Sequence, residues 1–96
     1  MALFHLGQLV ATAGVAEAMR ENPDFDAFVQ ASLARYLQGD WGDLEESDKK
    51  MNDAAVKNGD DRILAAYKKN DGKAWKIWII TEWDRSATTV LFPDEY

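Results

Sequence analysis

AWKIWIITEW, residues 74–83, decides the fold, because bulky apolar side chains occupy both of its alternating faces. Successive side chains of a β-strand point to opposite sides of the sheet. The odd-numbered positions share one side: Trp75, Ile77, Ile79, Thr81 and Trp83. The even-numbered positions share the other: Lys76, Trp78, Ile80 and Glu82. A strand that is apolar on both sides is typical of the interior of a sheet, so residues 74–83 are predicted to be the central strand of a meander.

Two further strands flank this one. Residues 62–69 alternate around Ile63, Ala65 and Tyr67, and residues 88–92 form a short apolar run. KNDGK, residues 69–73, predicts a tight hairpin, since Asn, Asp and Gly accept positive φ. The apolar residues 3–11 predict a short strand or an extended lead-in. We therefore expect a three-stranded antiparallel meander, with room for a short fourth strand from the N-terminus.

Three helices are predicted ahead of the meander. Thr12 can cap the first, and the second has Asn22 as its cap, Pro23 at its first position and Gly39 as its stop. The third should run from about residue 44 to residue 57, with Asp43 opening a capping box. All three helices are expected to pack on one face of the sheet, which gives a single α+β domain over residues 1–96.

The predicted core combines the apolar face of the second helix with one face of the sheet. Its members are Phe25, Phe28, Val29, Leu33, Tyr36, Leu37, Ile63, Ile77, Ile79, Val90 and some of the tryptophans. The opposite face of the central strand is only half apolar, because Trp78 and Ile80 alternate with Lys76 and Glu82. That face is expected either to be covered by the N-terminal segment or to serve as an interface.

Composition excludes several classes of function. The chain has no cysteine, so disulfides and thiolate chemistry are ruled out. Its net charge of −6, with the basic residues scattered, disfavours nucleic-acid binding and mildly favours a basic partner. No run approaches the ~20 apolar residues of a membrane span, so neither a membrane nor a secreted location is expected and the cytoplasm is the default.

Acidic residues suggest one possible chemistry. Asp40, Asp43, Glu82 and Asp84 could hold Mg²⁺ or Mn²⁺ for phosphoester hydrolysis if three of them converged. The alternative is that Asp40, Asp43, Asp60 and Asp84 lie at turns or helix ends and accept hydrogen bonds from nearby backbone N–H groups. His5 is the only histidine and has no local partner, and no nucleophile elbow or nucleotide-binding glycine motif occurs. No cofactor is therefore expected.

TEWDRS, residues 81–86, also has two interpretations. Glu82 and Arg85 could face outward and bind a partner, together with Trp78 on the half-apolar face and Trp41 in the turn GDWGDL. Alternatively, Asp84 accepts a hydrogen bond from the N–H of residue 86 or 87 and sets a turn, while Arg85 pairs with the carboxylate of Glu82 or Asp61. Trp83 is expected on the same face as Trp75.

Four stretches together resemble a known family: LGQLVATAG (6–14), GDWGDL (39–44), NDAAVKNGDDRILAAY (52–67) and WIITEWDRSATTVLFPDEY (78–96). The family comprises small uncharacterised bacterial proteins of plasmids, phages and integrative conjugative elements. Its members are labelled "plasmid-related protein" or type I restriction methylase subunit. The methylase label does not fit this chain, because its NPDF (22–25) is a helix start and no cofactor loop is present.

The resemblance implies a mobile-element accessory protein and supplies no catalytic residues. The favoured function is a non-enzymatic module that binds a host or element-encoded protein. The alternatives are a divalent-metal-dependent phosphoester hydrolase and an acidic DNA mimic that inhibits restriction. The sequence leaves the oligomeric state open, a homodimer included.

Overall fold

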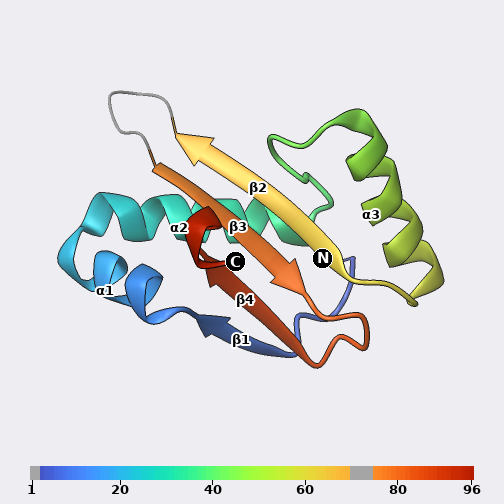
Figure 1. The fold of residues 1–96 in the computed structure, drawn as a ribbon, viewed down its shortest axis with the longest axis horizontal. Helices are drawn as coiled ribbons and strands as arrows, with labels where there is room; N and C mark the ends of the chain where they lie inside the picture. Colours follow the sequence, from blue (N-terminus) through green and yellow to red (C-terminus); the bar gives the residue numbers. More distant parts are fainter. Residues whose placement is uncertain (1–2, 70–74) are drawn as a thin grey trace.

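The computed structural model describes residues 3–69 and 75–96, and Figure 1 shows helices gathered around one four-stranded sheet. The elements follow in the order β1 (Gln8–Ala11), α1 (Ala13–Glu21), α2 (Pro23–Leu37), α3 (Glu46–Asn58), β2 (Ile63–Lys69), β3 (Trp75–Thr81), β4 (Ala87–Leu91) and the 3-10 turn η1 (Pro93–Glu95). The α+β class is confirmed.

The sheet has the order β1-β4-β3-β2. Strands β2, β3 and β4 form the predicted antiparallel meander, with β3 inside the sheet. The N-terminal strand β1 does form, and it pairs with β4 in parallel, so the complete sheet is mixed rather than antiparallel. Gln8 N–H donates to the Ser86 carbonyl and Thr12 N–H donates to the Val90 carbonyl, both at 3.0 Å.

The central strand is shorter than predicted. It ends at Thr81, and the chain then turns back into β4. Trp83 lies in that turn and is 63% exposed, so the prediction that it shares a face with Trp75 is wrong. The predicted hairpin at 69–73 falls largely on residues 70–74, outside the described residues. The strands on either side of it are in register, from Ile63 opposite Thr81 to Lys69 opposite Trp75.

The predicted caps of α1 and α2 are confirmed. Thr12 accepts a hydrogen bond from Val15 N–H, and the Asn22 side chain accepts from the N–H groups of residues 24 and 25. Beyond α2, Gly39 has φ of 83°, which suits a glycine after a helix end. The capping box of α3 is wrong: Glu45 is the N-cap and makes no side-chain cap bond, while the Asp43 carboxylate accepts from Lys68 N–H on β2.

The helices do not all cover one face of the sheet. α1 and α2 pack behind it, whereas α3 lies along the outer edge of β2 (Figure 1). The reason is visible in the sequence of α3, whose buried residues are only Asn52 and Ala55. A helix with so narrow an apolar stripe cannot bury enough surface to cover a sheet face, and it contacts a strand edge instead.

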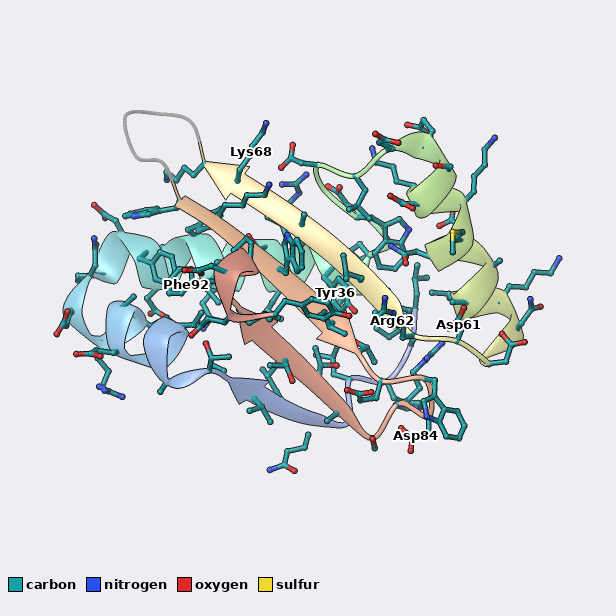
Figure 2. All side chains as sticks on the ribbon, in the orientation of Figure 1. Tyr36, Asp61, Arg62, Lys68, Asp84 and Phe92 are labelled. Atoms are coloured by element: carbon teal, nitrogen blue, oxygen red, sulfur yellow. The ribbon has the colours of Figure 1, made fainter. Side chains whose placement is uncertain are left out.

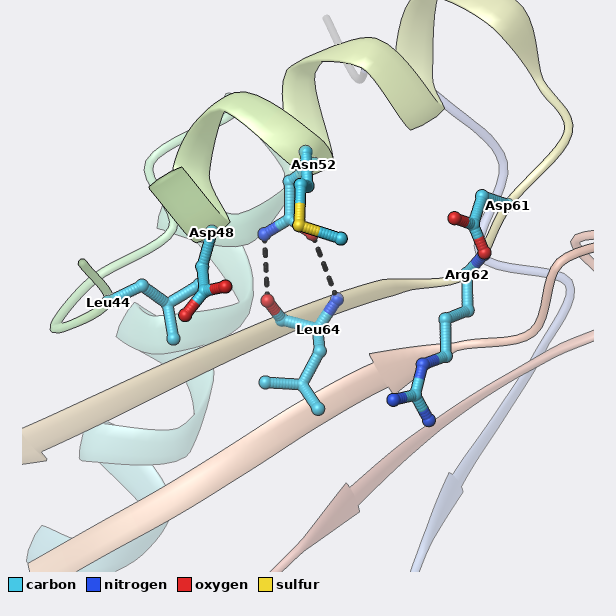
Figure 3. Close-up of a pocket in the computed structure, with 7 residues that line it drawn as sticks. Leu44, Asp48, Asn52, Asp61, Arg62 and Leu64 are labelled. Carbon is cyan, nitrogen blue, oxygen red and sulfur yellow. Dashed lines mark hydrogen bonds between the residues drawn. The ribbon is translucent and has the colours of Figure 1, made fainter. Parts of the chain in front are cut away.

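The edge of β2 is sealed by hydrogen bonds from outside the sheet. The Asn52 amide donates to the Leu64 carbonyl at 2.7 Å, and its oxygen accepts from Leu64 N–H at 3.3 Å, as Figure 3 shows. Asp43 N–H donates to the Ala66 carbonyl at 2.7 Å, and Ala66 N–H donates to the Trp41 carbonyl at 3.4 Å. With Lys68 N–H bound to Asp43, this edge has no free donor between residues 64 and 68.

The core lies between α1, α2 and the inner face of the sheet, as predicted. The cluster of buried residues contains Phe25, Val29, Leu33, Tyr36, Ile63, Ile77, Ile79 and Val90 from the predicted set. Phe28 and Leu37 keep intermediate exposure. Of the tryptophans, Trp41 is the buried one, at 3% exposure.

A chain of hydroxyl groups runs through this core. Thr88 donates to the Leu6 carbonyl at 2.7 Å, so the hydroxyl of Thr81, 2.7 Å from that of Thr88, must be the donor to it. The Tyr36 hydroxyl lies 2.7 Å from that of Thr81 and also donates to the Ile63 carbonyl at 3.3 Å, so these two acceptors share its single proton. The three hydroxyls link α2, β3, β4 and the N-terminal segment, and none is left without a partner.

Candidate functional site

The face of the sheet opposite α1 and α2 carries partly exposed apolar side chains. Leu64 and Ile80 lie opposite each other on β2 and β3, and Trp78 lies opposite Ala66. Leu64, Trp78 and Ile80 all have intermediate exposure, whereas Ile77 and Ile79, on the inner face, are fully buried. The half-apolar face expected from the alternation of residues 76–82 is therefore present.

The C-terminal residue covers part of this face. The rings of Tyr96 and Trp78 meet edge to face, with their centroids 5.4 Å apart. Arg62 donates from Nη1 to the Tyr96 hydroxyl at 2.6 Å. Tyr96 nevertheless remains 64% exposed. Of the two alternatives for this face, partial cover by the N-terminal segment is wrong, because that segment extends the sheet at its edge as β1. We call Arg62, Leu64, Trp78, Ile80 and Tyr96 the outer-face cluster.

A pocket of about 220 Å³ adjoins this cluster between α3 and β2 (Figure 3). Its lining consists of Leu44, Asp48, Met51, Asn52, Asp61, Arg62 and Leu64. Arg62 and Leu64 thus belong to both the pocket and the outer-face cluster. Leu44, Met51 and Leu64 supply apolar walls, while Asn52 is already committed to the β2 backbone.

Charge is unevenly distributed along this surface. Asp48 and Asp61 line the pocket, and Glu82 is exposed at the same end of β3. At the other end, Lys68 and Lys76 lie directly opposite each other on β2 and β3, and both are exposed. Figure 2 shows Lys68 at one end of β2 and Asp61 beside its other end. The pocket end of the face therefore carries three carboxylates beside the guanidinium of Arg62, and the opposite end of β2 and β3 carries two lysines.

The four predicted binding residues are not brought together. Trp78 is in the outer-face cluster, and Glu82 is exposed at the turn that follows β3. Trp41 is buried in the core and donates from Nε1 to Asp53 at 2.9 Å, which leaves it almost no surface for a partner.

Arg85 acts as a tether between two elements. Its guanidinium donates to the backbone carbonyls of Asp61 at 2.6 Å and Ala55 at 2.9 Å, as well as to those of Glu82 and Trp83. The expected pairing with a carboxylate is therefore wrong, because the carbonyls at the C-terminal end of α3 lie within reach. The expected turn is confirmed, since Asp84 accepts from Ser86 N–H at 3.0 Å.

Three of the four candidate metal ligands, Asp40, Asp43 and Asp84, accept hydrogen bonds from backbone N–H groups, as the structural alternative predicts. Asp40 pairs with Arg35 at 2.7 Å, and this hydrogen bond holds its pKa below the ordinary value. Hydrogen bonds from Ser86 lower the pKa of Asp84. Over residues 3–69 and 75–96, no three acidic or histidine side chains gather into a group that could hold a metal ion. His5 is exposed in the segment before β1.

Sequence reasoning missed the pocket, Arg62, Leu64 and Tyr96. Leu64 had a usable signal, because the alternation that places Ile63 inside places Leu64 outside. Its partnership with Ile80 depends on the hairpin register, which the alternation alone does not give. Tyr96 had no signal, since the sequence does not show that the chain after β4 folds back over the sheet.

Comparisons with family models, with curated proteins and with solved structures find no match to this chain. Within the described part of the chain, no helix combines the length and the apolar character that crossing a membrane would require.

Proposed function

We propose that this chain is a non-enzymatic protein-binding module that uses the outer-face cluster and the adjoining pocket. The observation that carries the proposal is the continuity of these two features, which share Arg62 and Leu64. They form a partly apolar surface that the described helices leave uncovered, and aromatic and Arg side chains of this kind are enriched at protein interfaces.

The size of the pocket favours a protein partner over a small-molecule ligand. Sites for small molecules commonly measure roughly 300–1,000 Å³. The pocket here, at about 220 Å³, is smaller and suits one side chain of a larger partner. The surrounding outer face then supplies the rest of the contact area.

The charges around the pocket indicate which residues flank the partner's inserted side chain. Asp48 and Asp61 at the pocket have no ion-pair partner among the described residues, and the whole chain carries a net charge of −6. The partner segment we propose carries an apolar side chain beside Lys or Arg. Electrostatic complementarity of this kind raises the association rate and selects among partners.

The setting follows from the resemblance to plasmid, phage and conjugative-element proteins described above. In that setting the module acts in the cytoplasm, as an accessory protein of a mobile element, on a host or element-encoded protein. Neither a metal nor a cofactor has a part in this function.

Selection from a displayed library of random peptides tests the proposal and requires no identified partner. We expect enriched peptides to combine Trp, Leu or Met with neighbouring Lys or Arg, and to lose binding when Trp78→Ala or Asp48→Asn is introduced. Trp83→Ala is the matched control, because Trp83 is 63% exposed but lies in the turn after β3. Binding that survives Trp78→Ala, or that Trp83→Ala abolishes equally, would refute the assignment of this surface.

A further inference from the structure

The two edges of the sheet are treated in opposite ways. The β2 edge is sealed by Asn52, Asp43 and the Trp41 carbonyl. The other edge is β1, and nothing in the described part of the chain lies against its outer side (Figure 1). An unprotected edge strand presents backbone donors and acceptors to any strand that can pair with it.

The register with β4 identifies the free backbone groups of β1. Gln8 and Thr12 donate to β4, and Val10 lies between them in the register, opposite Thr89. In a parallel ladder the bonded residues alternate along each strand, so Gln8, Val10 and Thr12 face β4. The N–H and C=O groups of Leu9 and Ala11 therefore point away from the sheet, and no partner for them exists among the described residues.

The side chains of this edge are suited to burial. Leu9 is 51% exposed and Val10 is 39% exposed. From residue 3 to residue 16 the sequence contains no Asp, Glu, Lys or Arg. Protected edge strands usually carry charged residues or proline, and β1 carries neither.

We propose that β1 pairs antiparallel with β1 of a second copy of this chain, which joins the two sheets into one. A twofold axis beside Val10 places Leu9 opposite Ala11 of the other copy, and Ala11 opposite its Leu9. Each of these is a hydrogen-bonded pair, so the two outward N–H and two outward C=O groups of one copy meet those of the other, and none is left over. Val10 then faces its own counterpart on the outer face, a β-branched pair of the kind that stabilises strand pairing.

The free backbone groups of β1 are self-complementary about a twofold axis, which favours a second copy as the occupant, and charge restricts where two copies can meet. Two chains of net charge −6 repel each other over most of their surfaces, so self-association requires a region without charge. The segment around β1 is such a region. Because β1 has four residues, the contact is small, and the dimer is expected to be weak, with a dissociation constant on the order of 0.1–1 mM.

Analytical ultracentrifugation of the full chain, from about 0.01 to about 1 mM, tests this proposal over the expected range. The wild-type chain should shift from monomer to dimer as its concentration rises. Leu9→Pro should abolish the shift, because it removes an outward N–H that β4 does not use, in an extended conformation that proline accepts. Val10→Lys should abolish it by placing two like charges opposite each other, whereas Val10→Thr should retain it.

Hydrogen exchange followed residue by residue locates the contact. The amides of Leu9 and Ala11 should become protected as the concentration rises, while that of Val10 is protected throughout. Thermal unfolding of dilute Leu9→Pro and Val10→Lys checks that the monomers remain folded. If proline disturbs the pairing of β1 with β4, Val10→Lys still tests the proposal, because it leaves the backbone of β1 unchanged. A wild-type chain that stays monomeric at 1 mM, or a dimer that survives both substitutions, overturns the proposal.

Discussion

Replacement of Arg85 sets two effects against each other at the turn between β3 and β4. Arg85 has φ of 61°, which makes it the one residue other than glycine with positive φ in the described part of the chain. Left-handed backbone costs a residue with a Cβ roughly 1–2 kcal/mol. The guanidinium offsets this cost by donating to four backbone carbonyls, two of them at 2.6 and 2.9 Å.

Arg85→Ala and Arg85→Gly separate these effects. Both variants lose the hydrogen bonds that tie the turn to the end of α3. A hydrogen bond from a charged donor is worth about 1.5–3 kcal/mol, but three of the four here are exposed to solvent. We therefore expect each variant to lose about 2–3 kcal/mol of stability. Glycine also relieves the strain of roughly 1–2 kcal/mol, and its greater freedom in the unfolded chain returns about 0.4–1 kcal/mol. Arg85→Gly should therefore be about 1 kcal/mol more stable than Arg85→Ala.

Urea unfolding monitored by tryptophan fluorescence measures this difference. A gap of 1 kcal/mol corresponds to about 4–8 °C in Tm for a chain of this size, which a thermal melt can check. The usual order, with alanine more stable than glycine, would refute the reasoning and show that the backbone at position 85 does not hold its left-handed conformation. Arg85→Lys should recover little of the loss, because an ammonium cannot reach the carbonyls of both Asp61 and Ala55.

Three further predictions address the sealed edge and the core. Asn52→Ala removes both hydrogen bonds to Leu64 and should lower the free energy of unfolding by about 2–3 kcal/mol in urea titrations. Asp48→Ala, at an exposed position of the same helix, is the control. Equal losses of stability in the two variants would contradict the role of Asn52. Gly42→Ala would place a Cβ against the Ala66 carbonyl oxygen, inside van der Waals contact, at φ of 76°. At least about 3 kcal/mol of stability should be lost, and an unchanged melting temperature would show that the loop does not follow this path. Burial raises the pKa of both Tyr36 and Tyr67 above the unfolded value of about 10. The free energy of unfolding is therefore unaffected by these groups below about pH 10, and above it falls by about 1.4 kcal/mol per pH unit for each tyrosine. Tyr36→Phe should halve that slope in urea titrations from about pH 9 to about pH 11.5, and an unaltered slope would contradict this prediction.

Local patterns predicted the elements better than they predicted the arrangement. The caps at Thr12 and Asn22 and the alternation of residues 74–83 depend on neighbouring residues, so the sequence displays them. The parallel pairing of β1 with β4 joins residues almost eighty positions apart, and no local pattern records it. The same holds for Asn52, because no helical pattern marks it as the residue that bonds a strand edge.

The candidate site shows the same division. Alternation alone placed Trp78 on a half-apolar face, and turn chemistry alone placed Asp84. Arg85 was expected to pair with a carboxylate, as its charge suggests. Its acceptors are instead backbone carbonyls, among them that of Ala55 in the last turn of α3 and that of Asp61 just after it, and the sequence could not position this helix. The sequence could not show that Trp41 is buried and not exposed for binding, because burial of a turn residue depends on how the turn packs.

The sealed β2 edge has a consequence for assembly. A chain with two open sheet edges can add copies at both ends and grow into a fibre, because each addition exposes a new edge. Here one end of the sheet is blocked by Asn52 and Asp43, so the β1 pairing that we propose would consume the open edge of both copies. Growth would then stop at two, and a substitution that uncovered the β2 edge would turn a self-limiting contact into a polymerising one.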